Sequence, residues 1–292
     1  MRLIIDAGST KMEWILMEGN VVKSRFMTEG FNPNYSDRHC LENIINLVET
    51  RLIASPNNDC PVSRRDESTS IQAMHYYGTG CGNPQNCQMI KEVFQCRFPD
   101  AEIHVTPDLM AVCHAVLGHE KGIACILGTG SNACVYDGKK LVDKAVSLGY
   151  LVGDEGSGMH IGKEVLRAYS YGFMPEDLRR QFEAKYHLEL KDFIQHLYHE
   201  AQPSKYLASF AEFAGEYKAH PYVQGLVKGC FKAFVEAFIL RFDECRSLKV
   251  GFVGSVAYYF NDVLEETLAD YGLTLGKVLK SPAEGLVRYY YQ

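Results

Sequence analysis

One short pattern occurs twice in this chain, and the two copies constrain its fold more than any other feature. Each copy is an apolar strand that runs into a turn of small and hydroxyl residues, followed by a second strand and a polar turn with glycine. The copies span residues 3–19 and 123–138. Both predict a hairpin. A repeat of this length indicates a duplicated domain with the two turns facing each other across a cleft, although two ordinary hairpins would give the same pattern.

The turn in the first copy has the residues that a phosphate-binding loop needs. A buried strand ends at Asp6, and Gly8 and Ser9 are small enough to let backbone N–H groups approach a phosphate closely. Thr10 and Lys11 add a hydroxyl group and a positive charge. We expect Asp6 to hold Mg²⁺, directly or through water, because Mg²⁺ favours a few carboxylates together with substrate phosphates. Taken alone, this pattern also occurs in proteins that bind no nucleotide.

The composition is that of a globular protein with two domains. The 292 residues are enough for two domains that each have a core, and 47% of them are hydrophobic. The net charge of −6 and the lack of a dense Lys/Arg cluster argue against a nucleic-acid partner. A strand follows Met1-Arg2 directly, and no apolar run approaches the length of a membrane span. We therefore expect a cytoplasmic protein with no signal peptide and no membrane segment.

The ten cysteines are scattered and include no Cys-x-x-Cys pair. Many lie inside apolar runs, which predicts buried free thiols in a reducing cytoplasm. A zinc site is the less favoured interpretation, because it needs four ligands at close spacing. The nearby candidates for such a site are limited to Cys81, Cys87 and His75.

Several polar residues beside predicted strand ends or helix starts are candidates for ligand binding, although each also has an ordinary structural interpretation. Asn32 lies in a loop, where it could turn the backbone or reach a polar ligand. Asp108 opens a helix near the junction of the two halves, where it could be a cap. Asp154 and Glu155 lie among glycines just before a helix, as in many binding loops, or simply favour the helix start. Gly254 follows a strand and could cradle a nucleotide or allow tight packing.

The remaining pattern predicts strands and helices in alternation. A further glycine-rich turn follows a strand at residues 78–82, and no P-loop or Gly-x-Gly-x-x-Gly fingerprint is present. The expected strands are 21–27, 71–77, 102–105, 248–253 and 273–279. The expected helices are 37–52 with Ser36 as the cap, 86–97, 106–118 and one at the C-terminus from 281, with 159–246 mainly helical. Residues 57–70 are expected to form a polar surface loop.

These motifs resemble those of the actin, sugar kinase and Hsp70 superfamily, and most of all those of the N-acetylglucosamine kinases within the BadF/BadG/BcrA/BcrD ATPase-like family. The stretches that carry the resemblance are 6–10, 128–132, 153–157, 252–256 and 281–285. The resemblance implies an α/β fold of two duplicated actin-like (ribonuclease H-like) domains with a cleft between them. One domain would comprise residues 1–119 joined by the C-terminal helix 282–292, and the other residues 120–281 with a helical insertion.

The resemblance also implies an activity, namely ATP-dependent transfer of the γ-phosphoryl group to a hydroxyl of an amino sugar such as N-acetylglucosamine. Asp108 would be the general base, and the substrates would be ATP with Mg²⁺ and a small-molecule sugar. The ATP-binding candidates are Asp6, Gly8, Ser9, Thr10, Lys11, Thr129, Gly254 and Ser255. The sugar-binding candidates are Asn32, Ser131, Asn132, Gly149, Asp154 and Glu155. Where some relatives have a His before the Gly-Asp-Glu-Gly pattern, this chain has residues 150–152, Tyr-Leu-Val, and it lacks an expected aromatic near Leu148.

Two other functions remain open at this point, as does a homodimer. The same family contains ATP-driven activators of dehydratases and reductases, in which an iron–sulfur cluster bridges a dimer. Cys125 lies about where such a protein has one cluster ligand, but no cysteine occurs between Cys134 and Cys230 to supply the second. A nucleotide-dependent sensor without catalysis is the other alternative, which the presence of Asp6, Asp108 and Asp154 disfavours.

Overall fold

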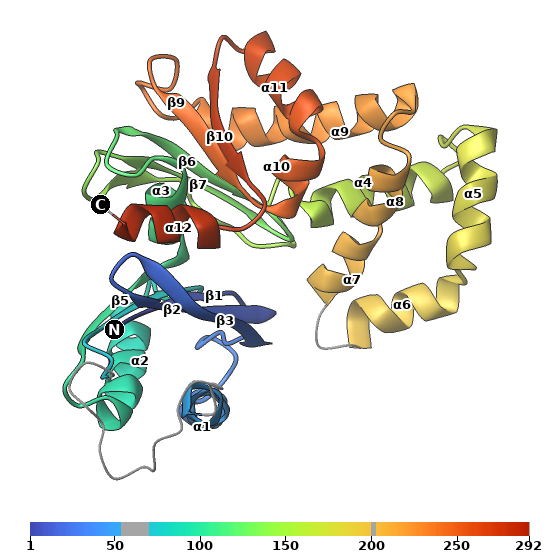
Figure 1. The fold of residues 1–292 in the computed structure, drawn as a ribbon. Helices are drawn as coiled ribbons and strands as arrows, with labels where there is room; N and C mark the ends of the chain where they lie inside the picture. The colour runs from blue at the N-terminus through green and yellow to red at the C-terminus, as the bar shows by residue number, and fades with distance from the viewer. Residues whose placement is uncertain (54–69, 200–202, 292) are drawn as a thin grey trace. The chain divides into compact units, whose positions relative to one another are not determined.

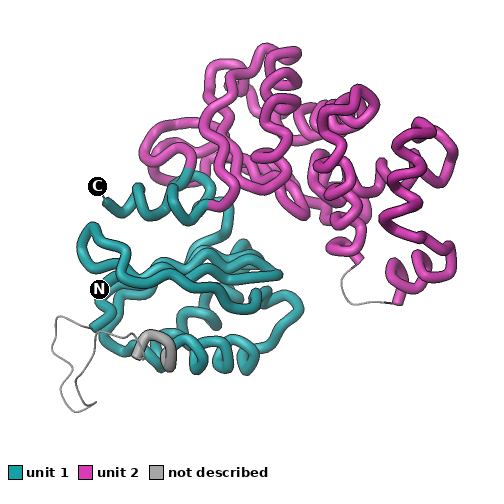
Figure 2. Tube along the Cα trace, turned by 45° about the vertical axis from the view of Figure 1, so that its right-hand side comes forward, with its two compact units in different colours: residues 1–115, 282–292 teal, residues 116–281 magenta. Residues whose placement is uncertain are grey.

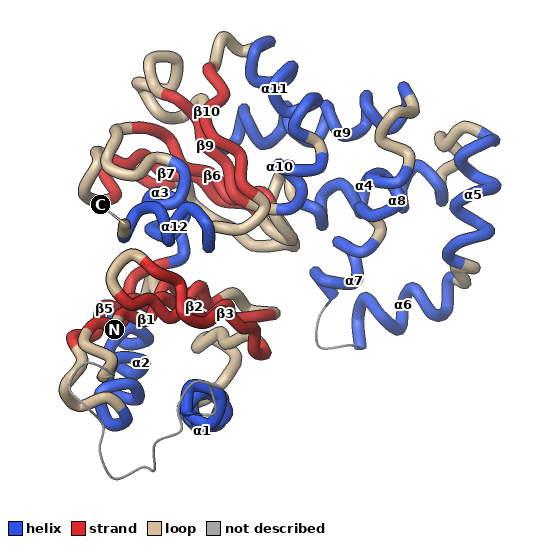
Figure 3. Tube along the Cα trace, in the orientation of Figure 1, coloured by secondary structure: helices blue, strands red, loops and turns tan. Residues whose placement is uncertain are grey.

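The computed structural model describes residues 1–53, 70–199 and 203–291, and it divides into two compact units. Unit 1 comprises residues 1–115 and 282–292, and unit 2 comprises residues 116–281 (Figure 2). Each unit contains one five-stranded sheet with helices packed against it (Figures 1 and 3). The expected polar loop at residues 57–70 lies outside the described residues except for its last residue.

The sheet of unit 1 combines an antiparallel hairpin with parallel strands. Its strand order is β3-β2-β1-β4-β5. The strands β1, β2 and β3 pair antiparallel, whereas β1, β4 and β5 run parallel. The elements of this unit are β1 (Arg2–Ala7), β2 (Lys11–Glu18), β3 (Val21–Glu29), α1 (Arg38–Ile53), β4 (Ala73–Gly78), α2 (Pro84–Arg97), β5 (Glu102–Pro107), α3 (Asp108–Val116) and α12 (Ala283–Tyr290).

Successive residues of β1 point to opposite faces of this sheet, and each face is covered by its own pair of helices. Leu3 and Ile5 belong to a buried cluster that includes residues of α1 and α2. Ile4 instead packs with residues of α3 and α12. A Cβ atom at Gly285 would lie 2.5 Å from the Cβ of Ala115, so glycine allows α12 to approach α3 closely. The C-terminal segment therefore completes the core of unit 1.

The sheet of unit 2 repeats this topology. Its strand order is β10-β9-β6-β7-β8, with β6, β7 and β8 antiparallel and β6, β9 and β10 parallel. The strands are β6 (Gly122–Leu127), β7 (Ser131–Tyr136), β8 (Leu141–Lys144), β9 (Lys249–Val253) and β10 (Thr274–Leu279). Because β6 and β7 correspond to β1 and β2, the duplication that the repeated pattern predicts is confirmed.

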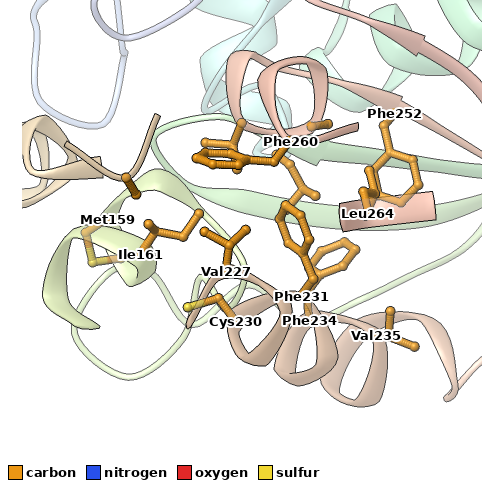
Figure 4. Close-up of a cluster of buried hydrophobic side chains, with 14 of the residues drawn as sticks. Met159, Ile161, Val227, Cys230, Phe231, Phe234, Val235, Phe252, Phe260 and Leu264 are labelled. Atoms are coloured by element: carbon orange, nitrogen blue, oxygen red, sulfur yellow. The ribbon is translucent and has the colours of Figure 1, made fainter. Parts of the chain in front are cut away.

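The chain between β8 and β9 is helical, as predicted, and it supplies most of the core of unit 2. Phe231, Phe234 and Phe252 are almost fully buried, and they belong to one apolar cluster that also contains Leu264 and Met159 (Figure 4). Aromatic side chains bury a large apolar area each, so this cluster dominates the packing of the unit. The helices between β8 and β9 are α4 (Gly158–Ser170), α5 (Glu176–Tyr186), α6 (Leu190–His199), α7 (Pro203–Ser209), α8 (Ala211–Glu216) and α9 (Pro221–Phe234), and α10 (Ser255–Tyr259) and α11 (Asn261–Asp270) follow β9.

Three local features differ from the sequence-based expectation. The N-terminal cap of α1 is Asp37 and not Ser36, because the Asp37 carboxylate accepts a hydrogen bond of 3.0 Å from the backbone N–H of Cys40. The region expected to be mainly helical up to residue 246 ends earlier, because α9 passes into a π-helix at 235–239 and then into turns. The strand β8 was not expected, since its four residues are too few to show a period.

Candidate active site

The turn between β1 and β2 is held from one side by the segment that follows β3. The backbone N–H of Gly30 donates to the carbonyl oxygen of Thr10 (3.1 Å), and that of Phe31 donates to the carbonyl oxygen of Gly8 (3.2 Å). A Cβ atom at Gly30 would lie 2.4 Å from the carbonyl carbon of Ser9. Only glycine therefore fits at position 30. The side chains of Ser9, Thr10 and Lys11 are exposed on this turn.

Asn32 is the buried polar residue beside that turn. Its side chain is 8% exposed, its Nδ2 donates to the Ser9 hydroxyl oxygen (3.0 Å), and its Oδ1 accepts from the backbone N–H of Asn34 (3.0 Å). The structure thus brings together Ser9 and Asn32, which the sequence assigned to two different ligands. The Asn32 amide has a second Nδ2 proton, which can be donated to a bound hydroxyl group.

Asp6 and Asp108 are half-buried carboxylates of the same unit. Burial raises the pKa of Asp6 from 3.8 to about 7, and repulsion from Glu13 and then Asp108 adds to the shift, while Lys11 opposes it. Burial also raises the pKa of Asp108, although its hydrogen bonds act in the opposite direction. The concentration of negative charge around Asp6 is an environment that favours a divalent cation, so the carboxylates fit the expected Mg²⁺.

The Asp108 carboxylate is held by one donor on each oxygen. The hydroxyl of Thr79 donates to Oδ2 (3.0 Å), and the backbone N–H of Leu109 donates to Oδ1 (2.9 Å). Sequence reasoning missed Thr79, although the glycine-rich turn at residues 78–82 drew attention to the segment. The hydrogen bond joins the end of β4 to the start of α3, which no local pattern could indicate.

In unit 2 the turn between β6 and β7 is joined to the start of α4. The backbone N–H of Gly158 donates to the carbonyl oxygen of Gly128 (2.8 Å), and that of Met159 donates to the carbonyl oxygen of Thr129 (3.2 Å). Within the turn, the N–H of Gly128 donates to the carbonyl oxygen of Gly130 (3.0 Å). These bonds fix the backbone and leave the Thr129 side chain exposed.

Asp154 adopts a left-handed backbone conformation, with φ of 59°, in the loop before α4. Its Oδ1 accepts a hydrogen bond of 3.5 Å from the backbone N–H of Ser131, and a Cβ atom at Gly130 would lie 3.1 Å from its Oδ2. Burial raises the pKa of Asp154, the bond from Ser131 opposes this shift, and Glu155 adds to it. The hydroxyl of Ser131 is buried and has no hydrogen-bond partner among the described residues. Such a hydroxyl is available to a polar ligand.

The other sugar-binding candidates of unit 2 lie in the same two segments. The Asn132 side chain is turned back on its own strand, where Oδ1 accepts from the N–H of Ala133 (2.9 Å). Gly149 has a φ of 72° and accepts a hydrogen bond of 2.9 Å from the N–H of Gly153, so residues 149–153 form one tight turn. Glu155 is half-buried next to Asp154.

Gly254 is confined by the end of β6. Its φ is 137°, and a Cβ atom there would lie 2.0 Å from the carbonyl oxygen of Leu127. The glycine therefore lets the backbone pass close to the end of β6 before it enters α10, where Ser255 is the exposed first residue. Tight packing is thus established for Gly254.

Cys125 lies inside β6 and is fully buried, so its thiol is placed as a core residue. Within residues 1–53, 70–199 and 203–291, no three His, Cys, Asp or Glu side chains gather in a way that could hold a metal ion. In the same part of the chain, no helix has the length and apolar character needed to span a membrane.

Comparison with protein-family models and with curated protein sequences found no match. Comparison with solved structures found the putative N-acetylglucosamine kinase of Porphyromonas gingivalis, with a TM-score of 0.88 and 34% identity over 100% of this chain and 99% of that chain. This chain belongs to the N-acetylglucosamine kinase-like family of sugar kinases. The predicted fold class, two duplicated actin-like domains, is confirmed by the two matching sheets and by this relationship.

Two more distant structures share the fold of this N-acetylglucosamine kinase-like chain. The protein of the same description from Chromobacterium violaceum has a TM-score of 0.72 and 16% identity, over 99% of this chain and 98% of that chain. A ROK family glucokinase from Streptomyces griseus, solved with glucose and AMPPNP, has a TM-score of 0.55 and 13% identity over the same shares of the two chains. At these identities the similarity establishes the fold alone.

Proposed function

We propose that this chain is an ATP-dependent sugar kinase that transfers the γ-phosphoryl group to a hydroxyl of an amino sugar such as N-acetylglucosamine. The observation that carries the proposal is the Asp108 carboxylate, which is half-buried, has a raised pKa and is held by two donors at the start of α3. Membership of a sugar kinase family, shared over the full length of the chain, supports the same reaction.

Asp108 acts as the general base in this proposal. A sugar hydroxyl is a poor nucleophile until its proton is removed, and a carboxylate can accept that proton as the oxygen attacks phosphorus. The new O–P bond forms while the bond between the γ-phosphorus and the β–γ bridging oxygen breaks, and ADP leaves with the electron pair. Burial favours the protonated carboxyl, so it makes Asp108 a stronger proton acceptor than an exposed aspartate.

Asp6 is the residue proposed to hold the Mg²⁺ that accompanies ATP, directly or through water. Bound there, Mg²⁺ supplies neutralisation of phosphate charge. Burial and two acidic neighbours make the charged form of the Asp6 carboxylate unfavourable when no cation is bound. A cation at this place would remove that penalty, so the residues fit the ion.

The remaining candidates divide into a nucleotide set and a sugar set. We propose that Thr10 and Thr129 contact the phosphates, because both side chains are exposed on backbone turns that hydrogen bonds fix. Backbone groups at Gly8 and Ser9, the charge of Lys11 and the residues Gly254 and Ser255 complete the proposed nucleotide site. For the sugar, the strongest support is the unpartnered buried hydroxyl of Ser131. The other members of that set are Asn32, Asn132, Gly149, Asp154 and Glu155.

A substrate screen tests this function directly. Purified protein is incubated with Mg-ATP and each of a set of amino sugars and hexoses, and both ADP release and the phosphorylated sugar are measured. We expect sugar-dependent ADP release with an equal amount of sugar phosphate. ATP hydrolysis without any sugar phosphate, across all acceptors, would contradict the proposal and favour a sensor or an activator.

A further inference from the structure

The turn at residues 78–82 holds a side chain that the proposed reaction has not yet used. Thr79 lies at the end of β4, where its backbone N–H donates to the carbonyl oxygen of Ala7 (3.0 Å). This bond extends the parallel pairing of β1 with β4, whose last paired residues are Ala7 and Gly78. The backbone of Thr79 is therefore fixed to the strand end that carries Asp6.

The side chain of Thr79 reaches from this strand end to another element. Its hydroxyl donates to Oδ2 of Asp108 at 3.0 Å, while the N–H of Leu109 donates to Oδ1 at 2.9 Å. The bond from Leu109 is local, because it joins neighbouring residues of the chain. The bond from Thr79 is long-range, and a helix cap has no need of it.

Two donors on two different oxygens fix the plane of a carboxylate as well as its position. A carboxylate has about four acceptor sites on its two oxygens, so Asp108 can accept a further hydrogen bond from a substrate hydroxyl. General-base catalysis depends on such an orientation, because a small displacement of a reacting group lowers the rate steeply. The Thr79 methyl group also keeps the side chain stiff at χ1, which holds the hydroxyl in place.

We infer that Thr79 is a positioning residue of the kinase reaction, because its hydroxyl ties the Asp108 carboxylate to the strand end that bears Asp6 and so fixes the direction from which Asp108 accepts the sugar proton. This inference rests on the proposed function. It adds to that function a residue that touches neither substrate in the proposal and acts through Asp108.

Substitutions at Thr79 separate a positioning role from a structural one. Thr79→Val keeps the size and branching of the side chain but removes the donor, and Thr79→Ser keeps the donor but removes the methyl group. We expect Thr79→Val to lower kcat roughly tenfold to a hundredfold, the size of effect that a misplaced catalytic group produces. The KM for ATP should stay within about twofold of the wild-type value, since ATP does not depend on Asp108 in this proposal. Thr79→Ser should restore most of the lost kcat.

The matched control is Thr267→Val, which removes the hydroxyl of a buried threonine in α11 that donates to the carbonyl oxygen of Val263. Its kcat should equal that of the wild type even if its Tm falls as far as that of Thr79→Val. Equal losses of kcat in Thr79→Val and Thr267→Val, or no rescue by serine, would overturn the inference.

The same experiment includes the wild type and Asp108→Asn, so that the sources of failure can be distinguished. Normal turnover of Thr79→Val beside an inactive Asp108→Asn overturns the role of Thr79 and leaves the kinase function standing. Normal turnover of Asp108→Asn overturns the assignment of the base, and the inference with it. A wild-type protein that phosphorylates no sugar overturns the proposed function itself, and the inference that rests on it.

Discussion

The backbone N–H of Ser131 donates to the carboxylate of Asp154, and this bond of 3.5 Å joins the start of β7 to the loop before α4. The two segments that contain most of the sugar-binding candidates of unit 2 are thereby connected. Asp154 has a left-handed backbone in this position, which is uncommon for residues other than glycine, although asparagine and aspartate adopt it more often than most. Backbone strain of this kind is often found at ligand sites, which agrees with the proposed role of Asp154 in sugar binding.

The first prediction follows from this contact. Asp154→Ala removes the acceptor and leaves a Cβ-bearing residue in the left-handed region, so we expect the KM for the sugar to rise at least tenfold, about the worth of a hydrogen bond to a charged group. Asp154→Asn keeps an acceptor and tolerates the conformation, so its loss of stability should be smaller. Steady-state kinetics and thermal unfolding of both variants check this. Equal Tm values for the two would show that the backbone at 154 is not strained.

A second prediction concerns the base. Asp108→Asn keeps the acceptor for the N–H of Leu109 but cannot take a proton, so turnover should fall by roughly two to four orders of magnitude. The KM for ATP and the Tm should change little, because Asn and Asp cap helices about equally. Single-turnover measurement of phosphorylated sugar with the wild type as reference tests it. Near-normal turnover would move the search for a base to Asp154.

The third prediction is a pH dependence of stability. Since the pKa of Asp6 is raised from 3.8 to about 7, the folded chain holds this proton more tightly than the unfolded chain. The contribution of Asp6 to stability is therefore fully present below 3.8 and is lost as the pH rises through about 7. Asp6→Asn should raise the Tm of the ligand-free protein by a few degrees at about pH 8 and hardly change it at about pH 4, while Mg-ATP turnover is lost.

The control for this experiment is the exposed Asp100. Asp100→Asn should leave the difference between the Tm values measured at the two pH values as it is in the wild type. Thermal unfolding in matched buffers gives both Tm curves. If Asp6→Asn raised the Tm by the same amount at both pH values, the raised pKa of Asp6 would be contradicted.

The fourth prediction compares two glycines of unit 2. Gly254→Ala places a methyl group 2.0 Å from the carbonyl oxygen of Leu127, at a φ of 137° that alanine rarely adopts, so it should destabilise the protein by about 3 kcal/mol or more. Gly229 lies inside α9 with nothing near its missing Cβ, so Gly229→Ala should stabilise the protein by about 0.5–1 kcal/mol. Denaturant unfolding measures both. A stable Gly254→Ala variant would mean that the backbone can move to relieve the contact between position 254 and Leu127.

The outline of the fold could be predicted from the sequence because the decisive residues are neighbours in the chain. The repeated strand-turn-strand pattern consists of residues that are close in the sequence, and it predicts the two sheets of matching strand order. The start of α1 was missed by one residue, because Ser36 and Asp37 are both acceptable caps and only the hydrogen bond from Cys40 decides between them. The strand β8 pairs with β7, and its four residues carry no signal of their own.

The site residues that sequence reasoning missed depend on contacts between distant segments. Gly30 must be glycine because the chain after β3 passes against Ser9, which is visible only once the sheet has formed. Thr79 meets Asp108 because β4 and β5 pair in register and place their ends together. A glycine-rich turn indicates that another group lies close to the backbone, but it does not identify that group.

The return of α12 to unit 1 has a consequence for how the protein is made. Ala283 and Leu286 complete the core on one face of the first sheet, around Ile4 and Ile15. These helix residues leave the ribosome after the whole of unit 2, so the segment translated first is the one that finishes folding last. Until then, the apolar face formed by Ile4, Ile15 and Met17 lacks the part of its cover that α12 provides, and a nascent chain stalled before residue 283 would expose that part to chaperones.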